Sequence, residues 1–264
     1  MRKQRKPKTR SPIRVRPLPY AGDSAQQAIY FHFGMYAAGA MALSMSAAML
    51  VFFWLLTLGV RRPNIWTASL MLLIFASAGA YFMCKHYRLS INILLGIDGE
   101  RAVAESLLQL SSQGYRVLHD IKLGRGPDSP NIDHVLVGPD GVFVIETKTL
   151  RKRTDQTQEI SVSGDDILVN GHKLPRSPIP QVRRSMRFVS EELGPHAQNC
   201  PVRGVVVFPG WWTKGGFDGD IWVLNEKAIV TKLKRSNSAA LSDQQRDQIY
   251  HLLSKLERTK LASK

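Results

Sequence analysis

The sequence predicts an α/β protein in which two apolar helices precede a sheet that helices cover on both faces. Two long stretches near the N-terminus, residues 24–60 and 63–84, contain no Asp, Glu, Lys or Arg. After residue 90, short segments rich in Val and Ile alternate with segments whose apolar residues recur at helical spacing. These patterns divide the chain into an N-terminal apolar part and a C-terminal globular part.

The net charge of +15 is unevenly distributed along the 264 residues. Twelve of the 36 basic residues precede residue 90, and the rest of the chain has 24 basic and 20 acidic residues, which leaves only +4. This composition excludes a disordered chain and a secreted disulfide scaffold, and it argues against a simple soluble enzyme. Cys84 and Cys200 fit neither a zinc site nor a disulfide framework, so we expect free thiols in a reducing compartment.

The apolar part, residues 28–88, is expected to cross a lipid bilayer twice as a helical hairpin. A helix needs about 20 apolar residues to span about 30 Å of hydrocarbon, and residues 36–58 and 65–84 meet this requirement. The link at residues 59–64 is short, charged and contains a proline, which predicts a turn. Ten Lys and Arg residues flank the outer ends and two lie in the turn. This bias predicts an integral protein of the cell or inner membrane with both termini in the cytosol.

Residues 1–27 form a basic tail that is interrupted by prolines and that we expect to be disordered. Residues 1–23 hold eight Lys or Arg and one Asp. Each basic residue near an anionic leaflet contributes about 1 kcal/mol of attraction, so anionic lipids are the expected partner of the tail. Contact of the tail with nucleic acid is the alternative.

Residues 90–264 are expected to form one domain, with glycines and prolines marking the ends of its elements. The order of helix, three strands, helix, two strands and helix favours a sheet with helices on both faces. The expected helices are 98–113, 181–193 and 243–256, and the expected strands are 115–123, 132–137, 142–149, 202–208 and 221–224, with a further hairpin at 164–166.

The strand pair at the centre of this domain brings charged residues together. A two-residue turn between Gly138 and Gly141 sets a register in which Asp133 lies opposite Glu146. Directly opposed residues have Cβ atoms about 4.5–5.5 Å apart. Lys148 follows Glu146 by two residues and therefore lies on the same face. A one-residue bulge at the turn would shift this register.

This arrangement favours metal-dependent chemistry. An isolated Glu and Lys at this spacing are ordinarily an exposed surface pair, but here both strands are rich in Val and Ile on both faces, which predicts burial. Two buried carboxylates repel each other, and Mg²⁺ or Mn²⁺ relieves that repulsion. Such a cation polarises a phosphoryl oxygen and activates a bound water, while Lys148 stabilises charge developing on phosphorus. His134 points to the face opposite Asp133, and we expect it to be structural.

Several motifs in order resemble the nuclease-related domain (NERD), a family placed in the PD-(D/E)XK nuclease superfamily. They are Gly96-Ile97-Asp98-Gly99-Glu100, Val117-Leu118-His119-Asp120, Asn131-Ile132-Asp133-His134-Val135, Gly138-Pro139-Asp140-Gly141-Val142-Phe143 and Ile145-Glu146-Thr147-Lys148. The resemblance covers roughly residues 95–208 and implies a restriction-endonuclease-like mixed sheet flanked by helices. It also implies that Asp133, Glu146 and Glu100 bind the metal, that Lys148 is catalytic, and that Gln181 supports the site.

The leading hypothesis is therefore a membrane-anchored, metal-dependent nuclease that hydrolyses phosphodiester bonds of DNA or RNA on the cytosolic side. The alternative is a membrane-anchored module with a nuclease-like fold that binds nucleic acid or a protein without turnover, and the weak +4 charge of the domain slightly favours it. A channel is disfavoured because the spans contain no charged residue. The sequence leaves open the choice of DNA or RNA, the mode of cleavage and the formation of an oligomer.

Overall fold

The computed structural model describes residues 21, 23–57, 65–122, 131–152, 159–194, 200–214, 217–235 and 240–262. Nearly all of the predicted tail and the whole predicted turn at residues 59–64 lie outside these ranges. The same is true of residues 123–130, which include the loop predicted at 124–130.

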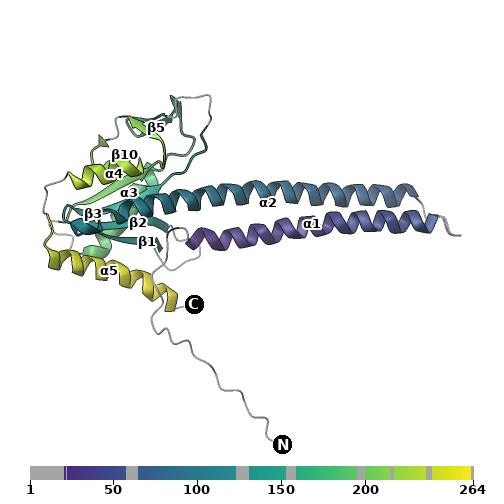
Figure 1. Cartoon of the computed structure of the whole chain (residues 1–264), viewed down its shortest axis with the longest axis horizontal. Coiled ribbons are helices and arrows are strands. Elements are labelled where there is room, and N and C mark those ends of the chain that lie inside the picture. The colour runs from purple at the N-terminus through teal and green to yellow at the C-terminus, as the bar shows by residue number, and fades with distance from the viewer. Residues whose placement is uncertain are drawn as a thin grey trace, which may run out of the picture.

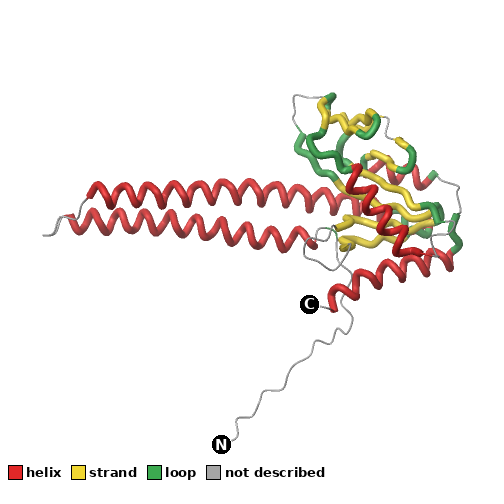
Figure 2. Tube along the Cα trace, turned by 180° about the vertical axis from the view of Figure 1, so that it is seen from behind, coloured by secondary structure: helices red, strands yellow, loops and turns green. Residues whose placement is uncertain are grey.

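Two long helices form a rod that projects from one side of the sheet domain (Figures 1 and 2). Helix α1 spans Asp23–Thr57 and helix α2 spans Ile65–Leu108. They run antiparallel and approach closely where Gly39 faces Gly79, since a Cβ atom on either glycine would lie 3.1–3.2 Å from the backbone oxygen of the other. The small residues thus permit close backbone contact.

Helix α2 differs from the two separate elements that we predicted. The predicted span at 65–84 and the predicted helix at 98–113 are parts of one helix of 44 residues. It contains no proline, so nothing in the covalent chain interrupts its hydrogen bonds. It ends five residues earlier than predicted, and a 3₁₀ turn at Ser111–Gln113 follows, closed by Gly114 in the left-handed conformation.

Among the described residues, one helical segment, Ala28–Trp54, is long and apolar enough to cross a membrane by length and composition. Only 11% of its apolar window is buried within the protein, so it is not a core helix. Several side chains of the second predicted span lie outside the described set, and its insertion remains a prediction.

The main sheet has six strands in the order β1-β2-β3-β7-β10-β9. Strands β1, β2 and β3 are antiparallel neighbours, β3, β7 and β10 are parallel, and β9 is antiparallel to β10. Their bounds are Arg116–Lys122, Asn131–Gly138, Gly141–Thr147, Val202–Val207, Ile221–Leu224 and Phe217–Asp218 for β1, β2, β3, β7, β10 and β9. All five strands predicted for this sheet are confirmed to within two residues at each end.

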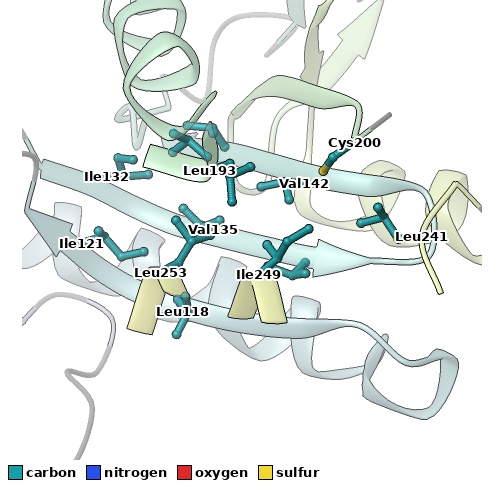
Figure 3. Close-up of a cluster of buried hydrophobic side chains, with 13 residues drawn as sticks. Leu118, Ile121, Ile132, Val135, Val142, Leu193, Cys200, Leu241, Ile249 and Leu253 are labelled. Carbon is teal, nitrogen blue, oxygen red and sulfur yellow. The ribbon is translucent and has the colours of Figure 1, made fainter. Parts of the chain in front are cut away.

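Helices cover both faces of this sheet, as predicted. Helix α3, Ile179–Leu193, and helix α5, Asp243–Ala262, pack on one face, and Figure 3 shows their Leu193 and Ile249 near Val135 of β2. The C-terminal half of α2 and helix α4, Glu226–Lys234, pack on the other face. Helix α4 was not predicted, although Asn225 caps it by accepting backbone hydrogen bonds from Lys227 and Ala228.

A second, smaller sheet has the strand order β6-β5-β4-β8. Its inner face packs through Ile160 and Ile167 against α3 and the main sheet. The predicted hairpin at 164–166 joins two of its strands, but the pairing with β8, some fifty residues later, was not predicted. The bounds are Glu159–Ser163, Asp166–Val169, His172–Lys173 and Trp212–Lys214 for β4, β5, β6 and β8.

The fold is thus mixed α/β with two sheets and flanking helices. That class was predicted from the sequence. The relationship to the restriction-endonuclease fold remains a prediction. Membrane insertion of the rod also remains a prediction.

Candidate active site

The register between β2 and β3 is the one predicted from the two-residue turn. Gly138 pairs with Gly141 and His134 pairs with Ile145, so Asp133 and Glu146 occupy the next opposed positions. Here the backbone N–H of Thr147 donates to Oδ2 of Asp133 at 2.6 Å. Gly141 has φ +123° and a Cβ there would lie 2.3 Å from the oxygen of Pro201, so only glycine fits this turn. The turn therefore holds the two carboxylates in register.

Glu146 is buried at the carboxyl end of β3, beneath helix α3. Nε2 of Gln181 donates to its Oε2 at 2.8 Å. Burial raises the pKa of Glu146, and the negative charges of Asp133 and Glu100 raise it further, while Lys148 and the Gln181 bond act in the opposite direction. The charged form of this carboxyl is therefore disfavoured unless a cation accompanies it.

The pKa of Asp133 is raised for similar reasons. Burial raises its pKa and the charge of Asp120 adds to this effect, whereas the Thr147 hydrogen bond and Lys148 lower it. Lys148 acts on both carboxyls and is itself half-buried. The two acids and the amine thus share one local electrostatic environment.

Glu100 reaches this site from helix α2, on the other side of the sheet. The preceding residue, Gly99, allows the close approach, since a Cβ atom there would lie 1.7 Å from Oγ1 of Thr149. The helix consequently lies directly against the segment that follows β3. All five residues predicted from the sequence, Glu100, Asp133, Glu146, Lys148 and Gln181, are brought to the same end of the sheet.

Residues 95–209 match the family model of the nuclease-related domain, NERD. The match begins within α2, ends just after β7, and contains all five predicted site residues. Searches of curated proteins and of solved structures found no match. The NERD match supports a nuclease-related function for this domain, while α1, the first part of α2, β8, α4 and α5 lie outside it.

The region that matches the NERD model has another buried acid near the site, which was not predicted from the sequence. In the β1–β2 register, His119 pairs with His134 and Ile121 pairs with Ile132, so Asp120 stands opposite Asp133. Asp120 is buried, has φ +55°, and accepts a hydrogen bond from the Asn131 side chain. Asp120, Asp133 and Glu146 therefore occupy aligned positions on three adjacent strands. The sequence could not align β1 with β2 because a long loop separates them.

His134 is completely buried, and its Nδ1 lies 2.8 Å from Nδ1 of His119. Burial lowers its pKa, and the neighbouring imidazole lowers it further, so His134 is neutral near pH 7. A neutral pair shares one proton between the two Nδ1 atoms. This geometry agrees with the structural role predicted for His134.

The fit of the carboxylate site to a metal ion depends on its donor atoms. No group of three or more His, Cys, Asp or Glu side chains in the described ranges is arranged to hold a metal. The adjacent carboxylates are those of Asp133 and Glu146, each using one oxygen for a protein hydrogen bond. Mg²⁺ commonly takes one or two carboxylates and completes its octahedron with waters and substrate oxygens. The donor set fits such a cation, and the ligand role of Glu100 remains a prediction.

Proposed function

We propose that this protein is a membrane-anchored nuclease that hydrolyses phosphodiester bonds of DNA or RNA at the cytosolic face with Mg²⁺ or Mn²⁺. The observation that supports it best is the pair of raised-pKa carboxyls, Asp133 and Glu146, beside Lys148 and inside the NERD match. A protein gains no stability from burying two acids so close together. A site that binds a cation and a phosphate explains their position.

Each residue then has a distinct task. Asp133 and Glu146 hold the cation, which when bound polarises a phosphoryl oxygen and lowers the pKa of water. Gln181 fixes the rotamer of Glu146 through its hydrogen bond. The ammonium of Lys148 stabilises the negative charge that develops on the phosphate during attack by water. Glu100 adds negative potential that strengthens cation binding.

The exposed apolar surface of the two-helix rod is evidence for the proposed membrane anchor. Large apolar side chains on both helices are exposed, including Met45 and Phe52 of α1 and Leu73 and Phe75 of α2. Each square ångström of apolar surface left in water costs about 25 cal/mol relative to burial, and a bilayer removes this cost. The charge bias favours both termini on the cytosolic side, where the basic tail would contact anionic lipids.

A second candidate function is a membrane-anchored module that binds nucleic acid or a protein and does not cleave. It is favoured by the lack, among the described residues, of a three-donor metal cluster. Without a cation, the raised pKa of Glu146 leaves this carboxyl mostly protonated near neutral pH, and such a site would be catalytically silent.

The deciding experiment is a cleavage assay on the full chain in nanodiscs. Single- and double-stranded DNA and RNA are incubated with Mg²⁺, with Mn²⁺ and with EDTA. We expect cation-dependent cleavage that falls by at least about 100-fold in Glu146→Gln and Lys148→Ala. Lys234→Ala, an exposed lysine on α4, is the matched control and should retain activity. Cleavage that survives unchanged in both site variants would exclude this function, and binding without cleavage would favour the second candidate.

A further inference from the structure

Helix α3 begins at the carboxylate site and leads away from it. Nε2 of Gln181, in the first turn of this helix, donates to Oε2 of Glu146 at 2.8 Å. The side of α3 that packs on the sheet is defined by its buried residues Ile179, Val182, Ser185, Val189 and Leu193. Gln181 is half-buried beside them, so it lies at the border between the packed side of the helix and its solvent side.

Two arginines follow Gln181 at intervals of three residues. Positions three apart on a helix are surface neighbours, with Cβ atoms about 5–6 Å from each other. A rise of 1.5 Å per residue puts Arg184 about 4.5 Å and Arg187 about 9 Å beyond Gln181 along the helix axis. Both arginines are exposed. Arg184 and Arg187, here called the arginine row, therefore extend from the edge of the carboxylate site onto the open face of α3.

The charges of the arginine row are not compensated within the described part of the chain. There, neither Arg184 nor Arg187 makes an ion pair or a side-chain hydrogen bond, although Glu191 follows Arg187 by four residues. Arg183, between them in sequence and position, differs: its guanidinium donates to both carboxylate oxygens of Asp165, at 3.1 and 2.7 Å. The two row arginines thus keep their donors available to an external anion.

The spacing of the arginine row suits a chain of phosphates better than a single one. A nucleic-acid strand carries one negative charge per ~3.4 Å of helix axis, so the distances from Gln181 correspond to the phosphates about one and about three positions away. The planar guanidinium donates two parallel hydrogen bonds to a phosphate. Contacts of this kind fix the position of a strand without reading its sequence.

We propose that Arg184 and Arg187 bind phosphates of a nucleic-acid strand that flank the phosphodiester bond held at Asp133 and Glu146. This inference rests on the proposed function and specifies its substrate as a polynucleotide rather than a small phosphodiester. An anionic membrane is another phosphate-rich surface. The nucleic-acid strand is favoured because the row continues directly from Gln181, which contacts the carboxylate site.

Binding without cleavage tests the arginine row independently of turnover. The full chain carrying Glu146→Gln is placed in phosphatidylcholine nanodiscs with EDTA, and fluorescence anisotropy follows labelled single- and double-stranded oligonucleotides. Arg184→Ala and Arg187→Ala should each weaken binding by about 5- to 20-fold and reduce the slope of log affinity against log salt by about one. Arg184→Lys keeps the charge and should keep the slope. Arg183→Ala, whose charge Asp165 already compensates, is the matched control and should change affinity by less than about twofold.

Cleavage of a minimal substrate separates the arginine row from the catalytic groups. Bis(p-nitrophenyl) phosphate has one phosphodiester and no flanking phosphate. With Mg²⁺ or Mn²⁺, Arg184→Ala should lower kcat/KM for an oligonucleotide by about 5- to 20-fold and leave hydrolysis of the small ester within about twofold. Lys148→Ala should lower both, because it acts on the reacting phosphate. Equal losses on both substrates in Arg184→Ala would show that this arginine supports the fold or the catalytic groups, and would overturn its role as a flanking contact.

The outcomes distinguish this inference from the proposed nuclease activity. Unchanged oligonucleotide affinity in both alanine variants would overturn the arginine row, and is the result expected if these residues contact anionic lipid instead. If the wild-type protein cleaves nothing while binding depends on Arg184 and Arg187, the nuclease proposal fails and the row stands. If the wild-type protein and both variants cleave oligonucleotides equally well, the nuclease proposal stands and the row fails. A parent protein that binds no oligonucleotide also overturns the row, whatever the cleavage assay shows.

Discussion

Both halves of helix α2 carry large apolar side chains, but these side chains have different surroundings. In the half that projects from the domain, Leu73 is 65% exposed and Phe75 is 60% exposed. In the half that packs on the sheet, Val103 and Leu107 are completely buried. A helix of 44 residues is about 66 Å long, roughly twice the thickness of a bilayer core. One continuous helix is therefore long enough to cover the sheet at one end and to cross a bilayer core at the other.

The apolar character of a helix therefore does not show whether other parts of the same chain cover it. Leu107 is buried by β-strands of its own chain, and Leu73 has no such cover in the described structure. The variants below therefore test each half with a matched substitution in the other.

The largest effect is expected from a cavity in the half that packs on the sheet. Leu107→Ala should lower the free energy of unfolding of the domain by about 2–5 kcal/mol, because it removes buried methyl groups and leaves a void. Leu73→Ala, on the projecting half, should leave that value nearly unchanged. Denaturation in detergent, followed by near-UV circular dichroism, measures both. Equal losses would show that both halves pack in the same way.

A charged side chain should be harmful in the projecting half of α2 and tolerated at an exposed position in the other half. Leu73→Arg places a guanidinium in the proposed span, at a cost of about 2.5–3.5 kcal/mol near the bilayer centre. Leu94→Arg, an exposed position in the other half, should be tolerated. The fraction of protein that resists alkaline extraction from membranes measures insertion. Full retention of Leu73→Arg would contradict a span at residues 65–84.

Two glycines of α2 provide a finer test of contact with the active site. Gly99→Ala introduces a Cβ against Thr149 and should destabilise the domain by about 1–3 kcal/mol while displacing Glu100. Gly96→Ala has no atom within 4 Å of its new Cβ and should stabilise the helix by up to about 1 kcal/mol. Thr149→Ala should rescue part of the Gly99→Ala loss in a double-mutant cycle. Identical effects of the two glycine substitutions would exclude the close approach.

The last test is a pH dependence of the stability of the domain. Because burial and Asp133 raise the folded-state pKa of Glu146 above its ordinary value of 4.5, the folded protein keeps a proton that the unfolded chain releases. The free energy of unfolding should therefore fall as pH rises above 4.5, by up to about 1.4 kcal/mol per pH unit for this group, until the folded-state pKa is passed.

Denaturation of the metal-free protein between pH 5 and pH 8 measures this slope. Glu146→Gln should reduce it, and Mg²⁺ should flatten it by stabilising the ionised carboxylates. A slope that is the same in Glu146→Gln would show that Glu146 does not titrate as proposed.

The sequence by itself determined the features that depend on local spacing. The two-residue turn between Gly138 and Gly141 fixes the β2–β3 register, because alternation in a strand leaves no freedom once the turn is set. The opposition of Asp133 and Glu146 follows from it. The buried strands β7 and β10 and the start of α5 were likewise predicted from apolar runs and a capping serine.

Only the tertiary structure decided the features that join distant segments. Asp120 aligns with Asp133 through a register that a long loop leaves undetermined in the sequence. The pairing of β4 with β8 joins segments that lie some fifty residues apart in the sequence. The continuity of α2 is also decided by packing, since the sheet covers one end of a helix that local propensity allows but does not require.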